Sequence, residues 1–133
     1  MSEVEFSEPV KKADKWAWVG SMLVTMALFF IGAFLTGDVM FSAIVGAGAG
    51  IGTQFLIPYQ ASMMVPADER VSLQEHPNAG NYHHGGAGTG LIVSSLVALA
   101  VMIVTMDSTV GLWVGGIVLA VSYFVFSSIL PRR

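Results

Sequence analysis

Three histidines stand close together in one polar stretch and are the side chains best able to carry chemistry. They are His76, His83 and His84, the only histidines in the chain, and carboxylates at positions 68, 69 and 75 precede them. Imidazole together with carboxylate suits zinc, copper or non-haem iron. Adjacent histidines point apart unless the backbone turns sharply, and no i, i+4 pair is present. Metal binding is therefore a hypothesis that ranks behind a simpler one, in which this loop docks on a partner or on its own helices.

A glycine-rich run, 85–90, follows the histidines directly. Backbone N–H groups of such a run can bind an anion where a helix begins. The lysine of a Walker motif is missing, however, and no G-x-G-x-x-G follows a strand. Phosphate binding is therefore not expected, and the abundance of Pro, Asn and Gly from position 77 onward predicts turns or extended backbone.

A second group of polar side chains surrounds Pro58 in an otherwise apolar segment. The group consists of Gln54, Tyr59 and Gln60. Proline removes one backbone hydrogen bond and bends a helix, and amides at this depth need hydrogen-bonding partners. We expect these side chains to join helices near the inner end of the segment. The alternative is a small polar cavity that faces the cytoplasm.

Glycines recur at a spacing of four in two apolar runs. The residues are Gly46, Gly48, Gly50, Gly52, Gly111 and Gly115. At 3.6 residues per turn, Gly46 and Gly50 share one helix face, and the other two glycines of that run lie roughly opposite. Each pair allows the backbone of another helix to approach closely. We expect these residues to pack helices, and at least one of the faces to bind another protein or another copy of the chain.

Several classes of function are excluded by residues that are absent or scarce. The net charge of −3 does not fit the clustered basic surface of a nucleic-acid-binding protein. The chain has no Cys, which excludes disulfides, thiolate catalysis and iron–sulfur clusters. Proton relays, ion pumps and intramembrane proteases need titratable groups at depth, and a bis-histidine haem needs histidines within the spans. We therefore expect no catalytic centre and no cofactor.

The elements that must position these residues are four long apolar runs. Of the 133 residues, 54% are hydrophobic and 11% are charged, whereas a soluble domain carries about 25% charged residues. Ranges 16–37, 39–67, 76–106 and 108–131 contain no Asp, Glu, Lys or Arg. About 20 apolar residues suffice for a helix that crosses a bilayer. The sequence predicts an all-α integral membrane protein with helices over 16–36, 39–64, 87–106 and 109–130, arranged as two hairpins.

The distribution of cations predicts the orientation. Lysines at 11, 12 and 15 precede the first span, one arginine at 70 lies between the second and third, and two at 132 and 133 follow the fourth. The opposite turns contain Asp38 and Asp107, which we expect to cap the following helices, but no Lys or Arg. The positive-inside rule therefore places both termini in the cytoplasm. This predicts a cytoplasmic segment 1–15, one membrane domain over 16–131, a cytoplasmic loop 65–87 and a tail 132–133.

These features favour a small multi-pass protein of the cytoplasmic membrane that is not an enzyme. Its expected role is that of an accessory or structural subunit of a larger membrane complex, for which an electron-transfer complex is one candidate, or of a homo-oligomer. The expected partners are the lipid bilayer, other membrane subunits or copies of itself, and no nucleic acid. Two alternatives remain: a small transporter or channel formed by an oligomer, and a metal-binding membrane protein that uses the His76–His84 loop.

Overall fold

The computed structural model describes residues 6–66, 68–69 and 82–131, and all regular structure within these ranges is helical. The helices are α1 (Glu8–Thr36), α2 (Val39–Met63), α3 (Tyr82–Thr105) and α4 (Ser108–Ile129). Each is long and apolar enough to cross a membrane. The predicted all-helical fold with four membrane-length helices is confirmed, and it indicates a multi-pass membrane protein.

The ends of the helices follow from local backbone chemistry. Gly37 ends α1 in the left-handed conformation, with φ of 71°, which glycine adopts without steric cost. The side chain of Asp38 then accepts a hydrogen bond from the N–H of Phe41 at 2.9 Å and so caps α2. Asp107 caps α4 in the same way, accepting from the N–H of Val110 at 3.2 Å. The prediction that both aspartates are N-caps is confirmed.

Helix α1 begins eight residues earlier than the expected span, at Glu8 instead of position 16. Proline is tolerated in the first turn of a helix, and Pro9 stands there. The side chains of Val10, Ala13 and Ala17 are buried, so this early part of α1 packs against the rest of the protein. The bounds expected from hydropathy therefore mark the apolar stretch and miss the amphipathic part of the helix that precedes it.

Helix α3 begins at Tyr82, earlier than the expected position 87, and the expectation of turns or extended backbone is wrong for residues 82–86. Glycines in this stretch bring α3 close to its neighbours. A Cβ added to Gly85 would lie 2.9 Å from the ring of Tyr59 on α2, and one added to Gly86 would collide with the Oγ of Ser127 on α4. Tertiary packing therefore outweighs the low helix propensity of glycine here.

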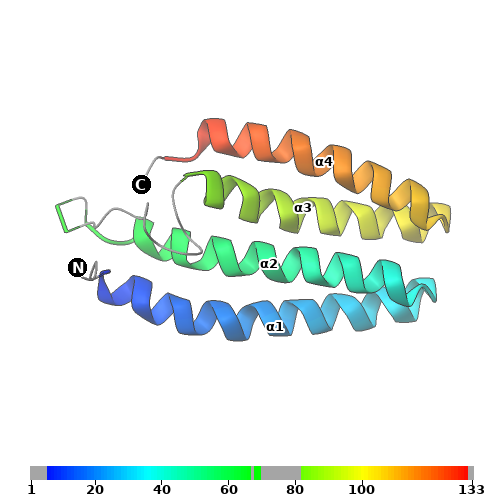
Figure 1. Ribbon diagram of the computed structural model, residues 1–133, viewed down its shortest axis with the longest axis horizontal. Coiled ribbons are helices and arrows are strands. Elements are labelled where there is room, and N and C mark those ends of the chain that lie inside the picture. Colours follow the sequence, from blue (N-terminus) through cyan, green and yellow to red (C-terminus); the bar gives the residue numbers. More distant parts are fainter. Residues whose placement is uncertain (1–5, 67, 70–81, 132–133) are drawn as a thin grey trace, which may run out of the picture.

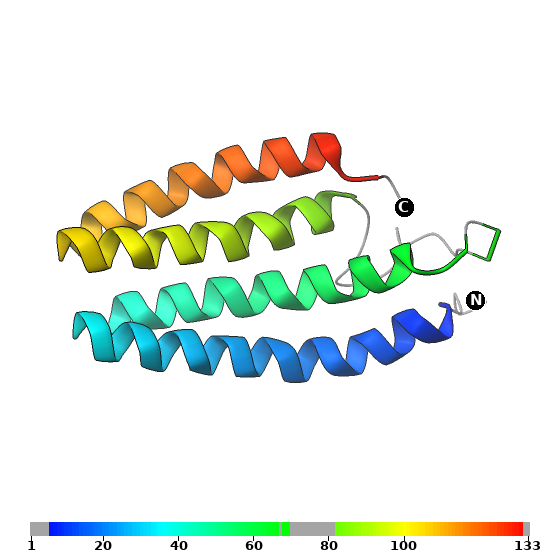
Figure 2. The same cartoon turned by 180° about the vertical axis from the view of Figure 1, so that it is seen from behind.

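The four helices lie side by side in the order of the sequence (Figure 1). Helix α1 packs against α2, α2 against α3, and α3 against α4. The view from behind shows the same row, with α1 and α4 at its two edges (Figure 2). The start of α1 and the end of α4 lie at one end of the helices, and the α1–α2 and α3–α4 turns lie at the other.

Buried apolar side chains gather in two clusters, one toward the α1–α2 and α3–α4 turns and one toward the opposite ends of the helices. The larger consists of Phe41, Val45, Ala98, Leu99 and Met102. The smaller joins Val10 and Tyr59 with the partly buried Phe6, Met63 and Leu130. Large apolar side chains at the edges are exposed instead, for example Phe34, at 88%, and Trp113, at 72%. Such an exterior suits hydrocarbon, because lipid does not penalise exposed apolar surface.

Candidate functional site

One glycine face of α2 lies against α1. A Cβ added to Gly46 would lie 2.7 Å from the carbonyl oxygen of Thr25. One added to Gly50 would collide with the hydroxyl of Thr25 and lie 3.0 Å from the carbonyl oxygen of Ser21. Real Cβ atoms do not occupy such positions, so any side chain here would push the two backbones apart.

The other glycine face of α2 lies against α3. A Cβ added to Gly48 would lie 2.8 Å from the Oγ of Ser95. At Gly52 it would lie 2.6 Å from the carbonyl oxygen of Gly88, and at Gly88 it would lie 2.8 Å from the carbonyl oxygen of Gly52. Both glycine faces of α2 are thus occupied by helices of the same chain.

The glycines of α4 lie against α3 in a comparable way. An added Cβ at Gly111 would lie 3.1 Å from the carbonyl oxygen of Ala98, and at Gly115 it would lie 2.8 Å from the Cβ of Ala98. Gly116 differs, because among the described residues no heavy atom beyond the adjacent backbone of α4 lies within 4 Å of a Cβ placed there. The use of any of these glycines by a partner stays a prediction.

The two described histidines are consecutive in α3 and turn toward different helices. The Nδ1 of His83 lies 2.9 Å from the hydroxyl oxygen of Tyr123 on α4, a hydrogen-bonding distance. The ring centroid of His84 lies 5.3 Å from that of Phe55 on α2, and its buried Nδ1 has no hydrogen-bond partner among the described residues. His76 lies outside the described residues. Within the described ranges, no three His, Cys, Asp or Glu side chains are placed to share a metal ion.

The polar residues around Pro58 do not all face one way. Tyr59 is buried, and its hydroxyl donates a hydrogen bond of 2.6 Å to the carbonyl oxygen of Pro131 beyond α4. Gln60 is exposed, and Gln54 is half-buried. Tyr59 therefore joins the C-terminal ends of α2 and α4. A cavity between α2, α3 and α4 and a groove along α3 and α4 are lined by other residues. Whether Gln54, Tyr59 and Gln60 form a polar cavity stays a prediction.

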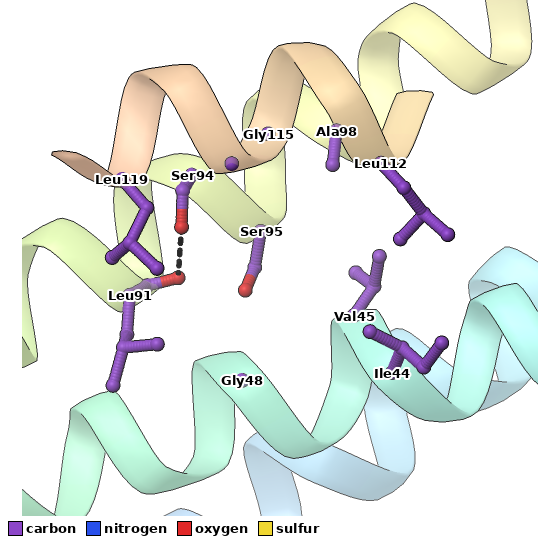
Figure 3. A pocket seen from close by; sticks show the side chains of 11 residues that line it. Ile44, Val45, Gly48, Leu91, Ser94, Ser95, Ala98, Leu112, Gly115 and Leu119 are labelled. Carbon is purple, nitrogen blue, oxygen red and sulfur yellow. Dashed lines mark hydrogen bonds between the residues drawn. The ribbon is translucent and has the colours of Figure 1, made fainter. Parts of the chain in front are cut away.

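A cavity of about 220 Å³ lies between α2, α3 and α4 (Figure 3). Small residues form much of its wall: Gly48, Ser94, Ser95, Ala98 and Gly115. Ser94 donates a hydrogen bond to the carbonyl oxygen of Leu91 at 3.2 Å, whereas the side chain of Ser95 extends from α3 toward Gly48. This cavity was not predicted from the sequence, although the serine pair opposite two glycines is a signal for it.

A wider groove of about 480 Å³ runs along α3 and α4 on their surface. Its wall includes Ala87, Gly116 and Leu119, and Tyr123 lies at the end nearest His83. The groove can hold an apolar chain or side chain. Among the described residues, neither lining contains Asp, Glu, Lys, Arg or His, and the groove carries the phenol of Tyr123.

No family model, no curated protein and no solved structure matches this chain.

Proposed function

We propose that the chain is an accessory or structural subunit of a larger membrane complex and has no catalytic centre of its own. The open row of helices is the observation that carries this proposal (Figures 1 and 2). In a closed four-helix bundle, every helix turns one side into a common core. Here the two middle helices, α2 and α3, also expose large apolar side chains, for example Ile44 on α2 and Val104 on α3. Lipid or other membrane helices can cover these surfaces.

The proposed assembly takes one of two forms. The first is a complex with different subunits, for which a respiratory or other electron-transfer complex is a candidate. The second is a homo-oligomer. We further propose that the chain lies in the cytoplasmic membrane as two hairpins, with both termini on the cytoplasmic side. The lysines near the start of α1 support this orientation, because cations are retained on that side.

A small transporter or channel formed by an oligomer is the second candidate function. The cavity between α2, α3 and α4 favours it, because it carries the hydroxyls of Ser94 and Ser95 within apolar helices. Serine hydroxyls can take part in hydrogen bonds along a path through a membrane protein.

The native particle that contains the chain tests the proposal. A C-terminal affinity tag, extraction in mild detergent and native mass measurement give the mass and composition of this particle. We expect a particle much heavier than the 14.1 kDa chain with its detergent, accompanied by the same companion proteins in every preparation. Several copies of this chain alone would support the homo-oligomer. A single copy without companions would contradict both forms of the proposal.

Reconstitution of the purified chain in liposomes tests the second candidate. Solute uptake or conductance by the chain alone would favour transport over a structural role. Gln54→Leu and Ser95→Ala then place the path, because the first removes an amide near the inner end and the second removes a hydroxyl from the cavity. If neither change reduced transport, the transport path would not pass Gln54 or Ser95.

A further inference from the structure

Helix α1 is longer than the hydrocarbon core of a bilayer. It has 29 residues and therefore spans about 43 Å, against about 30 Å of hydrocarbon. Counted back from Thr36 at its far end, Trp16 lies at about 30 Å and Lys12 at about 36 Å. Trp16 thus stands at the edge of the hydrocarbon, where indole rings are favoured. Lys12 and Lys15 stand at the depth of the lipid headgroups.

Lys12, Lys15, Trp16 and Val19 share one face of α1, because their spacing is i, i+3, i+4 and i+7. Their side chains enclose a shallow recess of about 480 Å³. The opposite face carries Val10, Ala13 and Ala17, which are buried against the rest of the protein. The recess therefore faces away from the helices and toward the surrounding lipid, at the edge of the row that α1 forms (Figure 1).

The charge of this recess is positive. Neither Lys12 nor Lys15 forms an ion pair within the described part of the chain. The nearest carboxylate along the same side is that of Glu8, and it lies 3.3 Å from the Nζ of Lys11. Asp14 falls on the opposite side of the helix from Lys12 by its position in the turn. The ammonium groups of Lys12 and Lys15 thus flank the recess, and Trp16 and Val19 form its apolar part.

We propose that this recess binds an anionic phospholipid. The phosphate of the headgroup lies between the ammonium groups of Lys12 and Lys15, which gain charge-assisted hydrogen bonds. The indole of Trp16 lies at the level of the ester linkages, and the first part of an acyl chain runs along Val19. Basic clusters next to a membrane span attract anionic lipids by the same electrostatics. This site does not depend on the subunit role, since it is complete within α1.

Lipid retention by the purified full-length chain tests the site. The protein is equilibrated with mixed micelles of phosphatidylglycerol and phosphatidylcholine, and the lipid that it retains is measured by native mass spectrometry. Lys12→Gln and Lys15→Gln are compared with Lys11→Gln, which removes the same charge from an exposed position outside the recess. We expect each of the first two changes to weaken phosphatidylglycerol retention about fivefold, which corresponds to about 1 kcal/mol per basic residue. Retention of phosphatidylcholine should not change.

Three results would overturn the proposal. Equal losses in all three variants would show a general effect of charge without a site. Equal retention of both lipids by the unchanged protein would show that an anionic headgroup is not recognised. Competition by millimolar inorganic phosphate, together with indifference to the acyl chain, would assign the recess to free phosphate. The exposed positions of all three lysines and equal thermal denaturation midpoints would exclude misfolding as the cause of any loss.

Discussion

Single atoms decide how closely α2 approaches its neighbours. At Gly46 and Gly52, an added methyl group would lie 2.7 and 2.6 Å from carbonyl oxygens of α1 and α3. Backbone atoms cannot yield as the end of a side chain can, so the whole helix would have to move. Because lipid supplies no hydrophobic drive between helices, this close contact is a main source of their association. We therefore expect the close packing that glycine allows at these positions to stabilise the fold by more than its low helix propensity destabilises it.

We expect Gly46→Ala to lower the free energy of unfolding by about 1–3 kcal/mol, the usual cost of overpacking a close contact. The measurement is unfolding of the detergent-solubilised protein by increasing sodium dodecyl sulfate. Gly116→Ala is the matched control, because its added Cβ has no heavy atom of another described helix within 4 Å. It should be neutral or stabilise the protein by up to about 1 kcal/mol through helix propensity. Equal effects of the two changes would contradict the assigned α1–α2 contact.

Both short turns, between α1 and α2 and between α3 and α4, depend on a capping aspartate. Thr36 lies before the first turn, and its hydroxyl bonds to the carbonyl oxygen of Gly32 at 2.7 Å and accepts from the N–H of Asp38 at 3.2 Å. Thr105 and Asp107 repeat this arrangement at the second turn, with a distance of 3.3 Å. In a membrane-length helix, these interactions satisfy polar groups close to the apolar region, where water is scarce.

Asp38→Ala should therefore destabilise the protein by about 1 kcal/mol, because the N–H of Phe41 loses its acceptor. Thermal denaturation of the purified protein is the readout. Asp38→Asn keeps a side-chain oxygen at the cap and should restore most of the loss, since Asn caps as well as Asp. If Asn were as destabilising as Ala, the carboxylate charge would matter more than the cap.

The molecule as a whole is a layer of helices in which the outer two have little protein around them. Its ends differ in character. The end that holds the start of α1 and the end of α4 carries the lysines, both described histidines and Tyr59, whereas the turns at the far end carry only Asp38 and Asp107 among the charged residues described there. This difference supports the proposed orientation through the positive-inside rule.

Labelling of single cysteines checks that orientation without removing any native thiol, because the chain has no Cys. Thr109→Cys places a thiol near the far-end turn, and Glu69→Cys places one near the lysine-rich end. Both positions are exposed. A membrane-impermeant maleimide added to intact cells should label the first and reach the second only after permeabilisation. The reverse pattern would show that the termini lie outside.

Composition, span length and capping chemistry were sufficient to predict four apolar helices and the aspartates that begin two of them. These properties are local, since each depends on the solvent and on residues within one or two turns. The pairing of the glycine faces, the divergence of His83 and His84 toward α4 and α2, and the cavity beside Ser95 could not be predicted. Helical periodicity predicts which residues share a face. Which helix packs against that face depends on how closely the two backbones can approach. In lipid this choice depends on packing between helices distant in the sequence, which no single segment contains.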